Sequence, residues 1–139
     1  MAEIKKINHI AFVVEDIESA LKFWRDIIGI PVDYTTQIPE EQSLVSFLSV
    51  GDSDVELVQP TSENSGIAKF LAKRGPGMHH ICLEVDDIKT LIEKLKNNGI
   101  QMINESPVER KDGRLYAFIH PKSANGVLVE LYQLAPLNE

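Results

Sequence analysis

Hydrophobic and polar positions along this chain follow a period of two in some segments and a helical period in others. Residues 7–14 and 78–85 alternate as half-buried strands do. Each segment leads to an aspartate, Asp16 or Asp87, and aspartate is favoured at the N-cap of a helix. Helical spacing of apolar residues follows, at Ile17, Leu21, Trp24 and Ile28 in the first case and at Ile88, Leu91, Ile92 and Leu95 in the second. The pattern therefore predicts a strand followed by a helix in two places.

These two places are copies of one another. The segment 7–30 aligns with 78–100, so that His9 matches His80 and Asp16 matches Asp87, each 71 positions later (80 − 9). The offset falls to 70 at Gly29 and Gly99 (99 − 29), which end the two helices, so the second helix is one residue shorter. An internal repeat of this length indicates a duplicated structural unit.

Each copy continues into three further strands. Extended segments are predicted at about 31–36, 44–50 and 54–59 in the first half and at about 100–104, 115–120 and 126–133 in the second, with turns at 50–54 and 120–126. A helix at 65–75, ended by Gly75 and Pro76, connects the halves. We therefore predict an α+β fold in one domain, 1–139, whose two βαβββ modules, at about 5–60 and 76–134, form a curved mixed sheet with a concave face for a ligand.

Composition and charge narrow the class of protein. With 43% apolar and 25% charged residues, the chain has the composition of a globular domain, and no apolar run approaches the length of a membrane span. The net charge of −7 disfavours binding to nucleic acid, and the cationic clusters at 69–74 and 110–114 are small. The N-terminus lacks the pattern of a secretory signal, and the single cysteine, Cys82, agrees with a reducing compartment. We predict a cytoplasmic location.

Strand alternation separates the two adjacent histidines. His80, Cys82 and Glu84 lie on one face of the predicted strand, whereas the apolar residues at 81, 83 and 85 lie on the other. The apolar face is expected to meet the helix, so His80 should point to the concave face and His79 should lie outside it. His9 holds the same position in the first copy.

The last strand of each half adds a matched carboxylate. Glu56 and Glu130 each lie between aliphatic residues, where desolvation of a carboxylate costs several kcal/mol unless a cation or donor meets it. A lone histidine or glutamate in a strand is more often structural than a ligand, but four such residues at equivalent places favour a shared metal ion. Imidazole and carboxylate donors suit a divalent first-row metal with open coordination positions.

Three other residues have ordinary explanations. Cys82 is expected to be a small packing residue and Trp24 a core anchor on the helix. His120 is predicted either to form the turn before Pro121 or to contact a substrate.

The segments "GMHHICLEVDDI" and "HPKSANGVLVELYQ", with His9 and the duplicated plan, resemble the vicinal oxygen chelate superfamily, which includes glyoxalases and bleomycin-resistance proteins. Within it, the sequence is most like a branch of metal-dependent epimerases, over about residues 5–133. The resemblance implies that His9, Glu56, His80 and Glu130 are the metal ligands, with Glu56 standing where some members have glutamine. It implies a divalent ion, cobalt first, with zinc, nickel or manganese as alternatives, and a homodimer.

The same resemblance implies interconversion of (2R)- and (2S)-methylmalonyl-CoA, with Glu130 as one acid/base and an acyl-CoA as substrate. Ser46 stands where certain epimerases have a second catalytic glutamate, and a shifted gap would place Glu41 there instead. Substrate contacts are expected from Ser46, His120 and Lys122, beneath an altered loop at 108–114. The alternatives are a glyoxalase I-type lyase acting on a hemithioacetal and a binding protein without catalysis.

Overall fold

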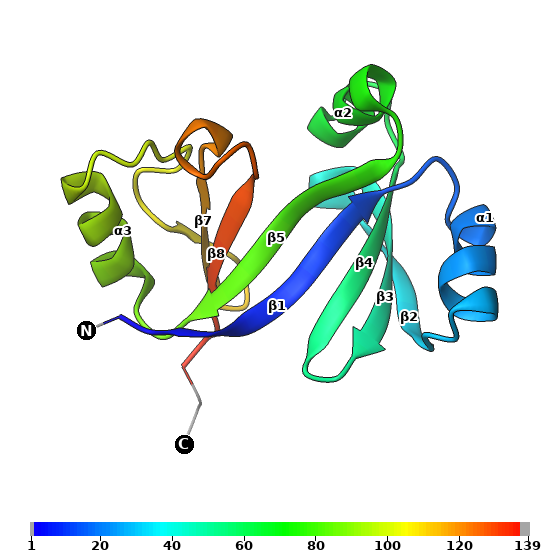
Figure 1. The fold of residues 1–139 in the computed structure, drawn as a ribbon, viewed down its shortest axis with the longest axis horizontal. Coiled ribbons are helices and arrows are strands. Elements are labelled where there is room, and N and C mark those ends of the chain that lie inside the picture. The colour runs from blue at the N-terminus through cyan, green and yellow to red at the C-terminus, as the bar shows by residue number, and fades with distance from the viewer. Residues whose placement is uncertain (1, 137–139) are drawn as a thin grey trace. The chain divides into compact units, whose positions relative to one another are not determined.

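The computed structural model describes residues 2–136, which form two compact units. One unit runs from His9 to His79, and the other joins the residues up to Asn8 to those from His80 onward. The strands are β1 (Ile4–Val13), β2 (Val32–Ile38), β3 (Ser43–Val50), β4 (Ser53–Pro60), β5 (Gly77–Val85), β6 (Val108–Glu109), β7 (Leu115–Ile119) and β8 (Val129–Gln133) (Figure 1). The α-helices are α1 (Ile17–Leu21), α2 (Gly66–Arg74) and α3 (Ile88–Asn97).

The two modules have the same strand order when one of them is read in reverse. In the first unit it is β2-β3-β4-β1, and in the second β5-β8-β7-β6. The first and last strands of each module pair in parallel, β1 with β4 and β5 with β8, whereas the remaining neighbours are antiparallel. The duplicated βαβββ plan, the mixed sheet and the α+β class are therefore confirmed.

The boundary between the units differs from the boundary of the sequence repeat, because it divides β1 and β5. The start of the chain packs with the second module: the Glu3 and Asp86 backbones bond to one another at 3.2 Å, and Asn8 Nδ2 donates to Glu84 Oε1 at 3.1 Å. The first residues of β1 therefore belong to the second unit.

Each module packs its helix against one face of its strands. In the second module, Ile88 and Ile92 of α3 contact Val85, Ala117 and Leu131 from three strands. In the first module, Ile17 and Leu21 of α1 contact the sheet through a second cluster, completed by Val14, Leu48 and Leu57. Val85, with Leu83 packed against the same cluster, lies on the side that alternation assigned to the helix, so the predicted register of this strand is confirmed.

The additional residue in the first helix produces a π-helical turn. After Leu21 the chain winds as a π-helix from Lys22 to Ile27, and Ile28 N–H donates to Phe23 O, five residues earlier, at 2.9 Å. A π-helical turn has bonds between residues five apart and so holds one more residue than an α-helical turn. The wider turn leaves Ile28 51% exposed, so its predicted place on the buried face is wrong.

The second module also departs from the prediction at 100–104. This segment makes only one isolated bridge, Met102 to Ile119, and the strand that pairs with β7 on the side away from β8 is β6. Backbone bonds still hold the segment against β7, with Ile103 N–H donating to Phe118 O at 2.8 Å. The Asn104 side chain accepts from Phe118 N–H at 2.8 Å. This side-chain bond takes the place of a backbone bond between neighbouring strands.

The connecting helix has the expected ends. Ser65 Oγ accepts from Ala68 N–H at 3.1 Å at the N-cap, and Gly75, with φ of 77°, ends the helix at Arg74. Among the described residues, none of the helices has the length and hydropathy needed to cross a membrane.

A glutamine in the last strand of each module binds the start of that module's helix. Gln59 Oε1 accepts from Ile17 N–H at 2.9 Å, and Gln133 Oε1 accepts from Ile88 N–H at 2.7 Å. These glutamines therefore join the helix N-terminus to the strand that carries Glu56 or Glu130.

Replacement of Gln133 by leucine is expected to lower the free energy of unfolding by about 1–3 kcal/mol, because the amide of the buried Ile88 would lose its acceptor. Urea denaturation followed by circular dichroism measures this change. Gln101→Leu, at an exposed position, is the matched control and is expected to change stability by less than about 0.5 kcal/mol. Equal shifts in the two variants would contradict the bond's contribution.

Candidate active site

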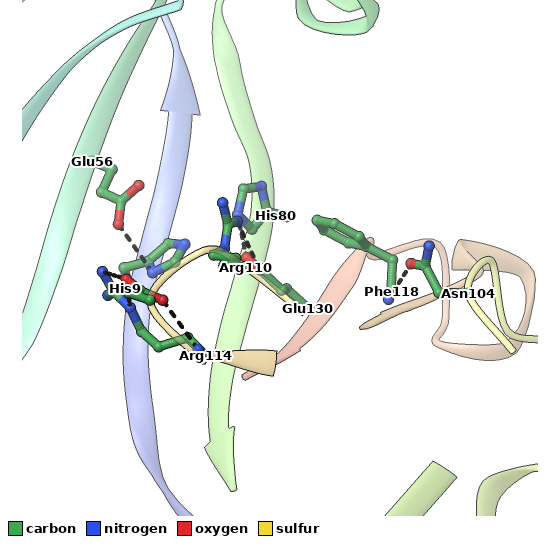
Figure 2. Close-up of polar contacts among 9 residues, drawn as sticks. His9, Glu56, His80, Asn104, Arg110, Arg114, Phe118 and Glu130 are labelled. Atoms are coloured by element: carbon green, nitrogen blue, oxygen red, sulfur yellow. Dashed lines mark hydrogen bonds and ion pairs between the residues drawn. The ribbon is translucent and has the colours of Figure 1, made fainter. Parts of the chain in front are cut away.

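The first module brings His9 and Glu56 together. Ala11 pairs with Glu56 between β1 and β4, so His9, two residues before Ala11, lies on the same face. His9 Nδ1 is 3.0 Å from Glu56 Oε2, and the side chains are only 10% and 15% exposed (Figure 2). A buried carboxylate thus meets an imidazole on the face away from α1.

The second module repeats this arrangement with His80 and Glu130. Cys82 pairs with Glu130 between β5 and β8, and His80 lies two residues before Cys82. His80 Nε2 is 3.2 Å from Glu130 Oε1, with the side chains 14% and 5% exposed (Figure 2). Each module therefore contributes one imidazole and one carboxylate by the same register, and the fully buried Cys82 lies directly beside Glu130.

Aromatic side chains line the same face of the second module. Tyr116 pairs with Tyr132, and Phe118 with Glu130, in the β7–β8 ladder. The Phe118 ring meets the His80 ring edge-on, with centroids 5.7 Å apart. Burial raises the pKa of Tyr132, and the nearby arginines 114 and 110 act in the opposite direction.

A cation that the sequence did not single out also reaches this face. Arg110 lies over the Tyr116 ring, with its guanidinium carbon 4.6 Å from the centroid. Its Nη2 is 4.0 Å from Glu130 Oε2 (Figure 2). From the sequence, Arg110 belonged only to a small cationic cluster in a loop, because no local pattern connects it with Glu130.

Acidic residues surround the pair in the first module. Asp54 shares the face of Glu56, and Ser49 Oγ donates to Asp33 and, at 3.5 Å, to Asp54 Oδ1. Burial raises the pKa of Asp54, helped by the negative charges of Glu56 and Asp33 and opposed by the bond from Ser49. The face is therefore strongly negative, and this favours a cation.

Ser46 does not share the face of Glu56. It pairs with Leu57, whose side chain packs with α1, so Ser46 points to the helix side of the sheet. It is fully buried there, and its Oγ is 3.0 Å from Thr35 Oγ1. Ser46 was expected to contact the substrate, but its side chain lies on the face opposite Glu56. Glu41 ends the exposed 3-10 turn Pro39–Glu41 just before β3.

His120 has the contacts of a turn residue. Its Nδ1 accepts from Lys122 N–H at 3.0 Å and caps the 3-10 turn Pro121–Ser123. Lys122 is exposed on that turn. Of the two roles left open by the sequence, the structure thus shows the structural one, and substrate contacts of His120 and Lys122 stay predictions.

The donor chemistry of the two pairs fits a divalent metal ion. Each module presents one nitrogen and one carboxylate on a largely buried face, and a buried carboxylate needs a cation or a donor. Two such pairs offer two imidazoles and two carboxylates, a ligand set that suits first-row divalent ions.

Comparison with known proteins gives the class to which this fold and these residues belong. The family model described as Glyoxalase/Bleomycin resistance protein/Dioxygenase superfamily matches residues 8–118. The chain therefore belongs to that superfamily, and the resemblance found in the sequence is confirmed.

Several similar relatives are methylmalonyl-CoA epimerases, enzymes of the isomerase class. The mitochondrial methylmalonyl-CoA epimerase of Homo sapiens is 40% identical over 129 residues, which cover 92% of this chain and 73% of that protein. The crystal structure of methylmalonyl-CoA epimerase from Mycobacterium tuberculosis has a TM-score of 0.83 at 30% identity, covering 96% of this chain and 90% of the other. A methylmalonyl-CoA epimerase in complex with methylmalonyl-CoA and NH4+ has a TM-score of 0.83 at 29% identity, covering 99% of both chains.

Proposed function

We propose that this protein is an epimerase that interconverts (2R)- and (2S)-methylmalonyl-CoA by removing and returning the proton at C2. The observation that carries the proposal is the repeated histidine–glutamate pair, which places the buried Glu130 carboxylate on the face lined by Phe118 and Tyr116. Similarity to methylmalonyl-CoA epimerases over more than nine-tenths of the chain supports the choice of reaction and of acyl-CoA substrate.

The reaction needs a proton acceptor and stabilisation of the charge that develops. When C2–H breaks, its electron pair moves into the thioester carbonyl to give an enolate, and the proton passes to a carboxylate. Glu130 is our candidate for that carboxylate, because it is only 5% exposed and lies in a rigid strand pair. Return of the proton on the opposite face inverts C2, and Glu41 is the remaining candidate for the second acid/base, since Ser46 faces the helix.

We further propose that His9, Glu56, His80 and Glu130 hold one divalent metal ion. When bound, such an ion supplies Lewis acidity and a template for the thioester oxygen and the substrate carboxylate. Cobalt is our first choice, with zinc, nickel and manganese as alternatives, since nitrogen and oxygen donors accept all of them. The buried position of both carboxylates beside imidazoles supports this ligand set.

Exchange of the C2 proton tests the reaction directly. Protein loaded with cobalt is expected to wash deuterium into both (2R)- and (2S)-methylmalonyl-CoA in deuterated water, as followed by NMR. Removal of the metal with a chelator is expected to slow this exchange by at least about 100-fold, because several kcal/mol of charge stabilisation would be lost. Re-addition of cobalt should restore it.

The exchange experiment also distinguishes the epimerase from a glyoxalase I-type lyase and from a binding protein. Absence of exchange in protein with stoichiometric metal would contradict the epimerase and make hemithioacetals of glutathione and other thiols the next substrates to test. Absence of both exchange and metal would favour a binding protein without catalysis.

A homodimer, a cytoplasmic location and a single-domain organisation accompany this proposal. They rest on the resemblance and on the composition of the chain. Light scattering of the purified protein measures the first of these.

A further inference from the structure

The turn between β6 and β7 fixes the position of the Arg110 backbone. Arg110 directly follows β6, and its N–H donates to Arg114 O at 2.8 Å, while Gly113 N–H donates to Arg110 O at 3.0 Å. Gly113 has φ of +89°, a conformation that favours glycine, and a Cβ there would lie 3.4 Å from Ala135 Cβ. The turn therefore has a defined backbone shape.

The guanidinium of Arg110 is directed along the face that carries Glu130. It stacks over Tyr116, which is two residues from Phe118 on the same side of β7. The Arg110 side chain is 31% exposed, whereas Glu130 beneath it is 5% exposed. Arg110 thus lies nearer to solvent than Glu130 on the same face.

The contact between Arg110 and Glu130 is long. At 4.0 Å it is an ion pair rather than a hydrogen bond, and the contact between Glu130 and His80 is shorter, at 3.2 Å. A guanidinium carries five donors in a planar fork, which suits carboxylates, and its stacking on an aromatic ring limits its motion. The cation therefore has the position and chemistry to meet an anion on Glu130's face.

Arg114, in the same hairpin, differs in its surroundings. Its Nε donates to Asp112 Oδ2 at 2.6 Å, so its charge is balanced within the turn. Its guanidinium carbon lies 5.7 Å from the Tyr132 centroid, and its side chain is 44% exposed. The same residue type on the other side of this one turn thus provides an internal comparison.

We infer that Arg110 is a specificity-determining residue that binds the free carboxylate of the substrate and so selects carboxylated acyl thioesters over neutral ones. The inference rests on the proposed function and adds to it the group that recognises the substrate class. A carboxylate has two oxygens, so one can meet Arg110 while the other is held elsewhere in the site. The loop at 108–114 thereby takes part in recognising the substrate carboxylate.

Binding measurements with two thioesters test this role. Isothermal titration of cobalt-loaded protein with methylmalonyl-CoA and with propionyl-CoA, which lacks the free carboxylate, gives a ratio of affinities. In Arg110→Gln we expect methylmalonyl-CoA to bind about 10- to 100-fold more weakly, the range for a hydrogen bond to a charged group, with propionyl-CoA changed by less than about threefold. A purely structural defect would weaken both thioesters alike.

Arg114→Gln is the matched control and should leave the ratio unchanged. Metal content and circular dichroism of each variant establish that the site and the fold are retained. If Arg110→Gln does not fold, Arg110→Lys carries the test, because it keeps the charge but loses the planar group, and its ratio should also fall.

An unchanged ratio in the folded Arg110 variant, or equal weakening of both thioesters, would overturn the inference. Failure of the proposed reaction gives a different result. In that case the wild-type protein would show no C2 exchange, while a carboxylate preference that depends on Arg110 would persist.

Discussion

Glu130→Gln is expected to slow exchange of the substrate C2 proton by about 10²- to 10⁴-fold, the usual contribution of a positioned acid/base. Glutamine has nearly the same shape and keeps an oxygen toward the metal position, but its amide cannot accept the proton. Because Glu130 is 4% exposed and held beside His80, little rearrangement is available to bring water into its place. The expected loss of metal affinity is smaller than the loss of exchange.

NMR exchange and metal analysis on the same preparation measure both quantities. Glu56→Gln is the matched control: Glu56 holds the corresponding place in the first module, and it stands where some members of the superfamily have glutamine. This variant should keep most of the exchange and the metal. Equal losses of exchange and metal in Glu130→Gln would leave Glu130 as a ligand only.

His80→Ala is expected to lose both metal and activity, whereas His79→Ala keeps stoichiometric metal. His80 Nε2 lies 3.2 Å from Glu130, which is beside Cys82 in the β5–β8 pair, on the face of the second module away from α3. His79 instead meets the ring of Phe70 in α2 edge-on, with centroids 4.9 Å apart. Loss of a direct ligand should weaken metal binding by more than about 100-fold, since an outer-shell partner alone contributes 10- to 100-fold.

Metal analysis after dialysis, followed by C2 exchange, distinguishes the two histidine variants. The adjacent position serves as the control, because both substitutions remove an imidazole from one strand. Stoichiometric metal in His80→Ala would refute the assignment of the ligand face.

Much of the fold could be predicted from the sequence because its determinants are local. Alternation in β1 and β5 assigns each side chain to a face, and Asp16 and Asp87 begin the helices as N-caps, accepting from the residue three positions later. The prediction failed where a local pattern had two structural solutions. The inserted residue near Ile28 became a π-helical turn, and the segment around Met102 was held by side-chain and backbone bonds instead of a regular ladder.

Some residues of the candidate site could likewise be identified from the sequence, and others could not. The two histidine–glutamate pairs, His9 with Glu56 and His80 with Glu130, could be found from the repeat. The same polar residue stands among aliphatic residues at equivalent positions of both copies, and such a coincidence indicates a function. The face of Ser46 could not be found in this way, because a change of one residue in strand register exchanges the two faces of a sheet and the register of β3 is set by its pairing with β4.

The sequence by itself determined the duplication, the class of fold and the four residues of the two histidine–glutamate pairs, because alternation, capping and repetition act over a few residues. Only the tertiary structure decided that Ser46 faces α1 and that Arg110 reaches Glu130 over Tyr116. Both depend on which residues of separate strands pair and on the path of a hairpin, and such pairings are set by packing across the sheet rather than by any neighbour in the chain.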